Sequence, residues 1–205
     1  VAQIANPKED SVILDLCSAP GGKATHLAQI MNNKGRIICC DIYKHKLELV
    51  KENANRLGIN IIETKLQDAQ VLDENMVGIF DICIVDVPCS GLGIIRRRPE
   101  IKWNRKEEDI DDLVEIQKNI LNNASKYVKP GGLIIYSTCT IEDSENLSRV
   151  NEFLSKNKEF KLSSFDQLIY YDENMKTSKQ GYVQMFPNIH GTDGFFIARI
   201  KKKNS

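Results

Sequence analysis

The sequence predicts an α/β fold with a mostly parallel, seven-stranded sheet, helices on both faces and an antiparallel hairpin at the C-terminal edge. Short β-branched runs alternate with longer helical patterns, which is typical of successive βα units. The last two extended runs follow each other directly, which favours a hairpin. A length of 205 residues with 41% hydrophobic content suits one sizeable core. We therefore expect a single domain over residues 1–205.

Each element has its own signal in the chain. Five apolar, β-branched runs are expected to be strands: "SVILDL", "GRIICCD", "NIIETK", "FDICIVDV" and "LIIYST". Apolar residues recur at three- and four-residue spacing over three expected helices, Lys23 to Met31, Lys44 to Leu57 and Glu107 to Tyr127. A helix is expected from near Glu142 to about Ser155, and the hairpin is formed by "GYVQMFP" and "GFFIARIK". The polar stretch 163–180 has only a weak period, so its structure stays open.

Charge balance and cysteine usage narrow the function classes. The chain carries 28 basic and 28 acidic side chains, so nucleic-acid binding would need a local patch. Its six cysteines form no C-x-x-C pair, and His26, His45 and His190 have no metal-ligand spacing, so we expect no metal and a reducing, cytoplasmic compartment. No run resembles a signal peptide or a membrane span. Val1 in place of methionine suggests that the first residues of the gene product are missing.

A small-residue turn, "LDLCSAPGGKATHL", follows the first expected strand. A phosphate-binding P-loop would need a glycine at Cys17 and a hydroxyl residue at Ala24, and the dinucleotide pattern G-x-G-x-x-G is absent. Gly21 and Gly22 would still allow the backbone to approach a ligand over the strand end. An ordinary tight βα turn is the alternative for this segment taken alone.

Acidic residues follow three of the expected strands. Asp41 ends the second strand, 19 positions after Gly22, a spacing at which a carboxylate commonly meets a ribose diol. Asp68 follows the third strand and could accept from an adenine amino group, and Asp86 ends the fourth. Any one of these acids alone is most often a solvated loop residue. Three of them at successive strand ends favour a nucleoside ligand.

Two cysteines also follow apolar strands, Cys89 in "IVDVPCSG" and Cys139 in "LIIYSTCTIEDSEN". Carbon 5 of a pyrimidine is a poor nucleophile, so its methylation usually needs a thiolate to add to carbon 6 first. Cys139 is the stronger candidate for attack, because Thr140 could cap a helix whose amide dipoles favour a thiolate. The alternative is a small core residue. We interpret the cysteines inside strands in that way: Cys39, Cys40 and Cys83.

The motifs "DLCSAPGGK", "DVPCSG", "KPGGLIIYSTCT" and "HGTDGFFIA" resemble those of the Nol/Nop/Sun family of RNA 5-methylcytosine methyltransferases. The segment "GIIRRRPEIKW" is most similar to the bacterial Sun branch, which acts on small-subunit ribosomal RNA. The resemblance extends over nearly the whole chain. It implies a Rossmann-like methyltransferase fold, with S-adenosylmethionine as methyl donor and a cytosine of 16S rRNA as substrate.

The resemblance also implies site residues. Cofactor contacts would come from Cys17, Ser18, Ala19, Pro20, Gly21, Gly22, Lys23, Asp41, Lys46, Asp68 and Asp86. Cys139 would be the nucleophile on carbon 6, and Cys89 would assist removal of the carbon 5 proton and release of the product. Asp86 would hydrogen-bond the ring nitrogen at position 3, and Lys23 would help to position the base.

RNA contacts are expected from one dense basic and aromatic cluster that follows "PCSG": Arg96, Arg97, Arg98, Lys102 and Trp103. The alternatives are a solvated basic surface and a tryptophan in the core. Family members carry an RNA-binding region ahead of the catalytic domain, and we expect that region to be absent here. We also expect a monomer with no membrane contact.

Other functions stay open at this level. The same chemistry could act on transfer RNA or another rRNA. A non-catalytic RNA-binding or ribosome-assembly factor could keep the fold, but it would be expected to lose a catalytic position, and Cys139, Cys89 and Asp86 are all present. A dehydrogenase on a similar fold is disfavoured by the missing G-x-G-x-x-G.

Overall fold

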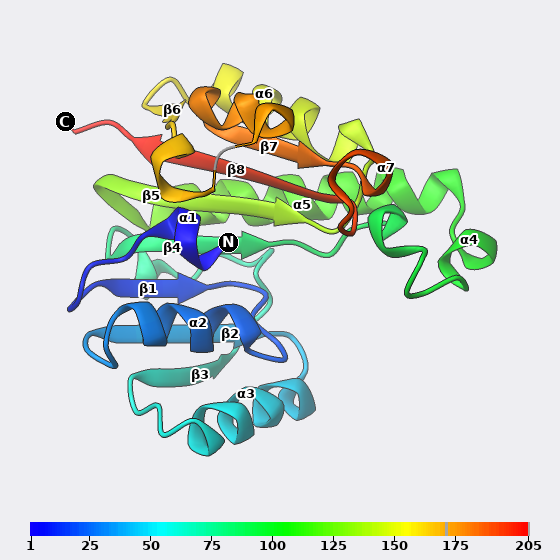
Figure 1. The fold of residues 1–205 in the computed structure, drawn as a ribbon. Coiled ribbons are helices and arrows are strands. Elements are labelled where there is room, and N and C mark those ends of the chain that lie inside the picture. The colour runs from blue at the N-terminus through cyan, green and yellow to red at the C-terminus, as the bar shows by residue number, and fades with distance from the viewer. Residues whose placement is uncertain (171, 205) are drawn as a thin grey trace.

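The computed structural model describes residues 1–170 and 172–204, which contain one mixed sheet of eight strands. The strands are β1 Val12–Asp15, β2 Arg36–Asp41, β3 Ile62–Leu66, β4 Phe80–Asp86, β5 Val128–Thr138, β6 Phe160–Leu162, β7 Tyr182–Met185 and β8 Phe195–Lys202. They are arranged in the order β3-β2-β1-β4-β5-β8-β6, and β7 also pairs with β8 (Figure 1). Strands β1 to β5 pair in parallel, and β8 runs antiparallel to β5, β6 and β7.

The predicted α/β class, parallel sheet and antiparallel C-terminal pair are confirmed. The sheet has one strand more than expected, because β6 and β7 share its last position. β6 pairs with residues 200–202 of β8, and β7 pairs with residues 195–198. β6 contains only the three residues "FKL", too few for an alternating pattern to indicate a strand. β8 therefore lies inside the sheet, and the hairpin reaches the edge only through β7.

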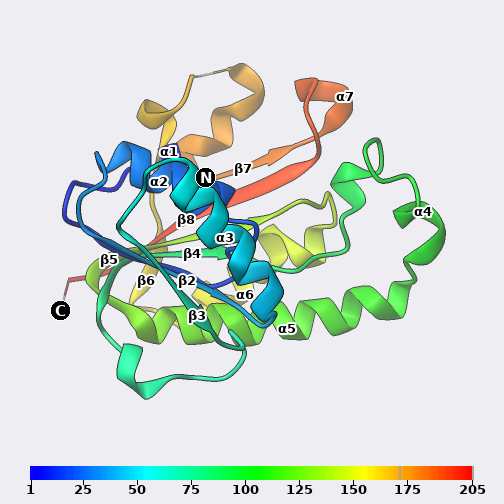
Figure 2. The same ribbon diagram turned by 90° about the horizontal axis from the view of Figure 1, so that it is seen from below.

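Helices cover both faces of the sheet (Figure 2). The α-helices are α1 Ala2–Ala5, α2 Gly22–Ile30, α3 Lys44–Arg56, α4 Ile101–Asn104, α5 Glu107–Tyr127, α6 Leu147–Lys156 and α7 Pro187–His190. Short 3-10 turns occur at η1 Glu74–Met76, η2 Leu92–Ile94, η3 Asp143–Glu145, η4 Asp166–Leu168 and η5 Glu173–Gln180. α1, α2 and α3 lie on one face, and α5 and α6 lie on the other. None of the helices within the described ranges combines the length and the apolar character needed to cross a bilayer.

Side chains alternate along the strands, so each strand contributes to two hydrophobic cores, one on each face of the sheet. In β1, Ile13 packs on the face with Leu27 of α2, whereas its neighbour Leu14 packs on the opposite face with Ile120 of α5. All four side chains are at least 97% buried. Full burial of one such side chain stabilises the fold by about 1.5–3 kcal/mol. Burial on both faces explains why these strands are continuous apolar runs in the sequence.

The expected helices agree with α2, α3 and α5 to within one residue at each end. The helix expected from near Glu142 was wrong at its start, because residues 143–145 form the turn η3 and α6 begins only at Leu147. Asn146 interrupts the helix with φ −111° and ψ −111°. Its side chain accepts from Thr138 of β5 and donates to Gln184 of β7 and to the Thr140 carbonyl, which fixes it outside helical geometry.

The chain after β4 leaves the body of the domain. η2 and α4 project beyond the carboxyl ends of β4 and β5, on the same side as α7 (Figure 1). Ligands bind outside the carboxyl ends of strands in open α/β sheets. The projecting segment therefore borders the place where a site is expected.

Candidate active site

A cavity of about 420 Å³ opens at the carboxyl ends of β1, β2 and β4. We call it the acidic cavity, because its wall includes Asp41, Asp68 and Asp86; the other lining residues are Leu16, Cys17, Ala19, Ile42, Tyr43, Lys46, Ala69, Gln70, Val87, Pro88, Ile116 and Ile120. Its volume lies in the range of small-molecule sites, roughly 300–1,000 Å³. The three acids expected at strand ends are thus brought together, with Lys46 beside them.

Two of these carboxylates keep a free acceptor. Asp41 Oδ1 accepts the amide of Tyr43 at 2.9 Å, and Asp68 Oδ1 accepts the amide of Gln70 at 2.9 Å. No donor reaches the second oxygen of either side chain among the described residues. The turn bonds hold both carboxylates at the cavity wall. Free carboxylate oxygens beside apolar walls at Ile42 and Ile116 fit a nucleoside with hydroxyl and amino groups.

The turn between β1 and α2 contributes fewer residues to the wall of the acidic cavity than expected. Of residues 17–23, Cys17 and Ala19 line the acidic cavity and the others do not. Gly21 has φ +97°, and a Cβ there would meet the Cγ1 of Val50 at 3.2 Å. This glycine is therefore needed for the left-handed backbone and for packing against α3. Gly22 has nothing within 4 Å of an added Cβ.

A second cavity of about 440 Å³, the thiol cavity, contains both predicted cysteines. Its walls are Cys89, Ser90, Gly91, Ile94, Arg98, Glu100, Ile101, Asn104, Arg105 and Cys139. The Sγ atoms of Cys89 and Cys139 lie 3.3 Å apart, and the Cys139 amide donates to Cys89 Sγ at 3.3 Å. Pro88 lines the acidic cavity and Cys89 lines the thiol cavity, so adjacent residues face the two spaces.

The pKa values of the two thiols are shifted in opposite directions. The hydrogen bond from the Cys89 thiol lowers the pKa of Cys139, and it outweighs the opposing effect of burial. The same contact, followed by burial, raises the pKa of Cys89. Cys139 is thus the thiol that ionises first, with Cys89 as its hydrogen-bond donor. A thiolate is the nucleophilic form of cysteine.

The helix-dipole explanation for Cys139 is wrong. Thr140 Oγ1 accepts the Glu142 amide at 3.2 Å, which closes a local turn, and no α-helix starts there. The next α-helix begins at Leu147. The effect of a helix dipole falls off within its first turn, so it does not reach Cys139. The neighbouring thiol and the positive charge of Lys23 favour the thiolate instead.

Lys23 and Asp86 form an ion pair next to the thiols. Lys23 Nζ lies 2.5 Å from Asp86 Oδ2, and the Ser137 hydroxyl donates to Asp86 Oδ1 at 2.6 Å. Burial lowers the pKa of Lys23, but the charge and hydrogen bond of Asp86 together raise it by more. The pKa of Lys23 therefore lies above its ordinary value. Lys23 therefore stays protonated and holds the carboxylate at this edge.

Asp15 ends β1 beneath the 17–23 turn and was not predicted as a site residue. It has no exposed surface, and neither carboxylate oxygen has a hydrogen-bond partner within residues 1–170 and 172–204. Burial raises the pKa of Asp15 to about 7, although the nearby Ser18 hydroxyl and the charge of Lys23 act in the opposite direction. This buried carboxyl is therefore half protonated near neutral pH.

Two glycines bring the C-terminal motif "HGTDGFFIA" against the cysteine loops. The Gly93 amide donates to the Cys139 carbonyl at 3.1 Å, and the Gly194 amide donates to the Gly93 carbonyl at 2.8 Å. A Cβ on Gly93 would meet the Gly194 oxygen at 2.2 Å and the Cys139 oxygen at 2.8 Å. No side chain fits at this crossing, which explains the glycine in each motif.

The basic cluster is divided by the fold. Arg96 and Arg97 pair with Asp193 at 3.5 and 2.8 Å, whereas Arg98 lines the thiol cavity. Trp103 is 79% exposed, so its alternative assignment to the core is wrong. Lys102 Nζ lies 5.2 Å from the Trp103 ring centroid. The exposed indole and Lys102 thus belong to the same segment as Ile101 and Asn104, which line the thiol cavity.

Cys39, Cys40 and Cys83 are fully buried, which confirms their interpretation as core residues. Several polar residues near the thiols were not predicted. Ser90, Gln117, Glu145 and Asn146 are fully buried. Asn146 lies four residues before Val150, so it extends the apolar spacing of α6 to a position just before that helix begins. A polar residue at a core position was the available signal. No group of three or more potential metal ligands occurs within residues 1–170 and 172–204.

Comparison with known proteins places this geometry in a family. The family model described as 16S rRNA methyltransferase RsmB/F matches residues 2–201. The chain belongs to this family. It is 40% identical to the probable ribosomal RNA small subunit methyltransferase B of Bacillus subtilis (strain 168), over 99% of the chain and 46% of that protein. It is 37% identical to ribosomal RNA small subunit methyltransferase B of Shewanella oneidensis, over 98% of the chain and 45% of that protein.

A solved structure of the same type supports the fold assignment. NSun6 from Pyrococcus horikoshii, crystallised with SFG, superposes with a TM-score of 0.87 at 34% identity, over all of this chain and 51% of that chain. SFG is the S-adenosylmethionine analogue sinefungin. The chain spans about half the length of the curated relatives it matches.

Proposed function

We propose that this chain is the catalytic part of an S-adenosylmethionine-dependent enzyme that methylates carbon 5 of a cytosine in 16S ribosomal RNA. The observation that carries the proposal is the pair of thiols 3.3 Å apart, in a cavity that adjoins a second, acidic one. Methylation of carbon 5 requires one group that adds to carbon 6 and another that removes the carbon 5 proton. Membership of the RsmB/F family supports the RNA substrate class.

S-adenosylmethionine fits the acidic cavity. The free oxygen of Asp41 would accept from the ribose hydroxyls, that of Asp68 from the adenine amino group, and Ile42 and Ile116 would pack on the adenine faces. Lys46 at the cavity wall would be a further polar contact. When bound, the cofactor supplies an electrophilic methyl group.

Cys139 would begin the reaction as a thiolate that adds to carbon 6 of the cytosine and makes carbon 5 nucleophilic. Its hydrogen bond from Cys89 favours that ionisation state. Once Cys139 is bonded to carbon, it no longer draws the Cys89 proton, and the main cause of the raised Cys89 pKa is removed. Cys89 would release its proton to solvent and then take the proton from carbon 5, while Cys139 leaves carbon 6.

Asp86 and Lys23 would act at the edge of the base. Electrons that enter the ring from the thiolate accumulate on nitrogen 3 and the carbonyl oxygen, so protonation of nitrogen 3 becomes favourable. The Asp86 carboxylate would accept a hydrogen bond from the protonated nitrogen, and the ammonium of Lys23 would face developing negative charge. Ser137 holds Asp86 in place through the 2.6 Å hydrogen bond.

RNA would approach from the side of α4. Trp103 offers an exposed ring for stacking, and Arg98 and Lys102 offer cations for phosphates. Arg96 and Arg97 are the weaker candidates, because Asp193 already pairs with both. The relatives are about twice as long as this chain, so an additional RNA-binding region that selects the target remains part of the proposal.

Transfer of labelled methyl groups tests the proposal. The full-length gene product would be incubated with 16S rRNA and labelled S-adenosylmethionine, as wild type, Cys139→Ala and Cys89→Ala. Wild type should label cytosine, Cys139→Ala should lose transfer, and Cys89→Ala should accumulate a covalent protein–RNA adduct. Activity retained in Cys139→Ala would contradict the nucleophile assignment. Transfer only to other RNAs would move the substrate to transfer RNA or another rRNA.

A further inference from the structure

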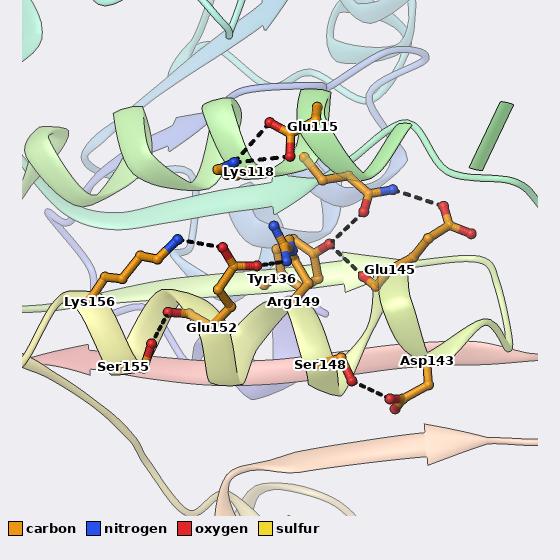
Figure 3. Close-up of polar contacts among 11 residues, drawn as sticks. Glu115, Lys118, Tyr136, Asp143, Glu145, Ser148, Arg149, Glu152, Ser155 and Lys156 are labelled. Carbon is orange, nitrogen blue, oxygen red and sulfur yellow. Dashed lines mark hydrogen bonds and ion pairs between the residues drawn. The ribbon is translucent and has the colours of Figure 1, made fainter. Parts of the chain in front are cut away.

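A buried carboxylate lies behind the two cysteine loops. Glu145, on η3, has no exposed surface, yet three donors converge on its oxygens. The Ser90 amide and the Gln117 side-chain amide each donate to Oε2 at 2.8 Å, and the Ser90 hydroxyl donates to Oε1. Figure 3 shows Glu145 close to Tyr136 of β5, whose hydroxyl donates to the Glu145 carbonyl at 2.7 Å. The carboxylate thus connects the turn after β4, α5 and η3.

The hydrogen bonds from Ser90 and Thr140 join the residues that directly follow the two cysteines. Their hydroxyl oxygens lie 2.8 Å apart. A carboxylate only accepts, so the Ser90 hydroxyl must donate to Glu145 and the Thr140 hydroxyl must donate to Ser90. The Glu142 amide in turn donates to Thr140 Oγ1 at 3.2 Å. Every proton in this chain of bonds points toward Glu145.

Contacts also hold the residues that precede the cysteines. The Gln117 amide donates to the Pro88 carbonyl at 3.0 Å as well as to Glu145. Asn146, the residue after Glu145, accepts from the Thr138 hydroxyl at 2.5 Å and donates to the Thr140 carbonyl at 3.1 Å. Each cysteine is therefore fixed on both sides, and Glu145 and Asn146 are adjacent in the chain.

We propose that Glu145 is a positioning residue that sets the separation of the Cys89 and Cys139 thiols. The inference rests on the proposed two-cysteine function. A carboxylate is costly to bury, and apolar side chains commonly join packed elements with equal or greater stability. Directional bonds to the residues after both cysteines do what apolar packing cannot, because they set the register of one loop against the other. Glu145 touches neither sulfur and acts only through Ser90 and Thr140.

Thiol alkylation tests this role without RNA or methyl donor. Iodoacetamide labelling of the Cys139 peptide, quantified by mass spectrometry across a pH series, reports its apparent pKa. Glu145→Gln turns one of the two acceptor oxygens into an amide donor, so at least one of the bonds from Ser90 and Gln117 is lost or reversed. The loops should shift apart, and the hydrogen bond from Cys89 to Cys139 should weaken. An upward shift of one pH unit lowers the thiolate fraction at neutral pH about tenfold. Cys89→Ala, which removes the donor itself, sets the full size of the shift.

Glu152→Gln is the matched control, because this glutamate lies on α6 and its side chain pairs with Arg149 and Lys156 (Figure 3) rather than with the cysteine loops. Its Cys139 profile should match that of wild type. A Glu145→Gln profile that also matches wild type, while Cys89→Ala shifts, would overturn the positioning role. A wild type that transfers no methyl group would overturn the proposed function and leave this thiol measurement unaffected.

Thr140 provides a second test if Glu145→Gln does not fold. Thr140→Val removes the hydroxyl at nearly constant volume and breaks the bond to Ser90, whereas Thr140→Ser keeps it. The expected result is a shifted Cys139 profile in Thr140→Val and a profile close to wild type in Thr140→Ser. Identical profiles in the two variants would show that the hydroxyl bond does not position the thiols.

Discussion

Asp15→Asn should make the stability of the folded chain less sensitive to pH. Asp15 has no exposed surface, and its carboxylate oxygens accept no hydrogen bond from the part of the chain that the structure describes. Burial raises the pKa of its carboxyl from 3.8 to about 7. Between these values the folded state holds a proton that the unfolded state has already released. Asparagine has a similar shape and carries no such proton.

Proton linkage gives both the direction and the size of the effect. Stability falls with rising pH wherever the folded state binds more protons, by about 1.4 kcal/mol per pH unit for one group. The contribution of the Asp15 carboxyl to the free energy of unfolding is fully present below pH 3.8, and it is lost as the pH rises to about 7. Between about pH 5 and 7 the wild type should therefore lose about 2 kcal/mol through this residue, because the slope decreases as the folded carboxyl ionises near pH 7. Asp15→Asn should not lose it.

Urea unfolding followed by circular dichroism, between pH 5 and 8, measures this difference. Circular dichroism is preferred because the one tryptophan, Trp103, is 79% exposed and reports folding poorly. Asp111→Asn, at an exposed position of α5, is the control, and its curve should parallel that of wild type. If the Asp15→Asn curve also parallels wild type across this range, burial does not keep Asp15 protonated and the reasoning is refuted.

Three further predictions concern the two cavities and the RNA surface. Gly93→Ala should lower the free energy of unfolding by about 1–3 kcal/mol through overpacking against Gly194. Gly22→Ala, whose added Cβ meets nothing within 4 Å, should leave thermal stability nearly unchanged. Equal melting temperatures for the two variants would contradict this. Asp41→Asn should weaken S-adenosylmethionine binding roughly ten- to a hundredfold in calorimetry, because a charged acceptor is lost while the turn bond to Tyr43 can remain; unchanged affinity would remove Asp41 from the cofactor site. Trp103→Ala should weaken RNA binding by about 1–3 kcal/mol if a base stacks on it, and a filter-binding affinity equal to wild type would exclude stacking.

Local patterns predicted most of the elements because those patterns have local causes. The apolar period of α3 and α5 indicates their lengths directly, and the parallel strands are apolar throughout because both faces are buried. The carboxyl ends of parallel strands lie at one edge, so Asp41, Asp68 and Asp86 could be predicted to share a site before their positions were known. The two cysteine motifs carried enough chemistry to predict a pyrimidine as the target.

At other positions the predictions from local patterns were wrong, because residues there pair with distant parts of the chain. Arg96 and Arg97 look available for RNA in the sequence, but Asp193 from the C-terminal motif pairs with both. The helix expected after Cys139 is absent because Glu145 and Asn146 make hydrogen bonds with distant residues, Ser90 and Gln184, in place of helical ones. No local period can indicate such contacts.

Residue types and short spacings were sufficient to predict the fold class, the strand ends that carry the acids, and the two cysteines as reactive candidates. The 3.3 Å separation of the thiols and the lowered pKa of Cys139 follow from the folded arrangement and could not be predicted from the motifs. Acidity in this pair depends on distance, burial and neighbouring charge, which are properties of residues far apart in the chain. The same reason explains why Glu145 could be recognised only after folding: its role consists of contacts with Ser90 and Gln117 on other elements.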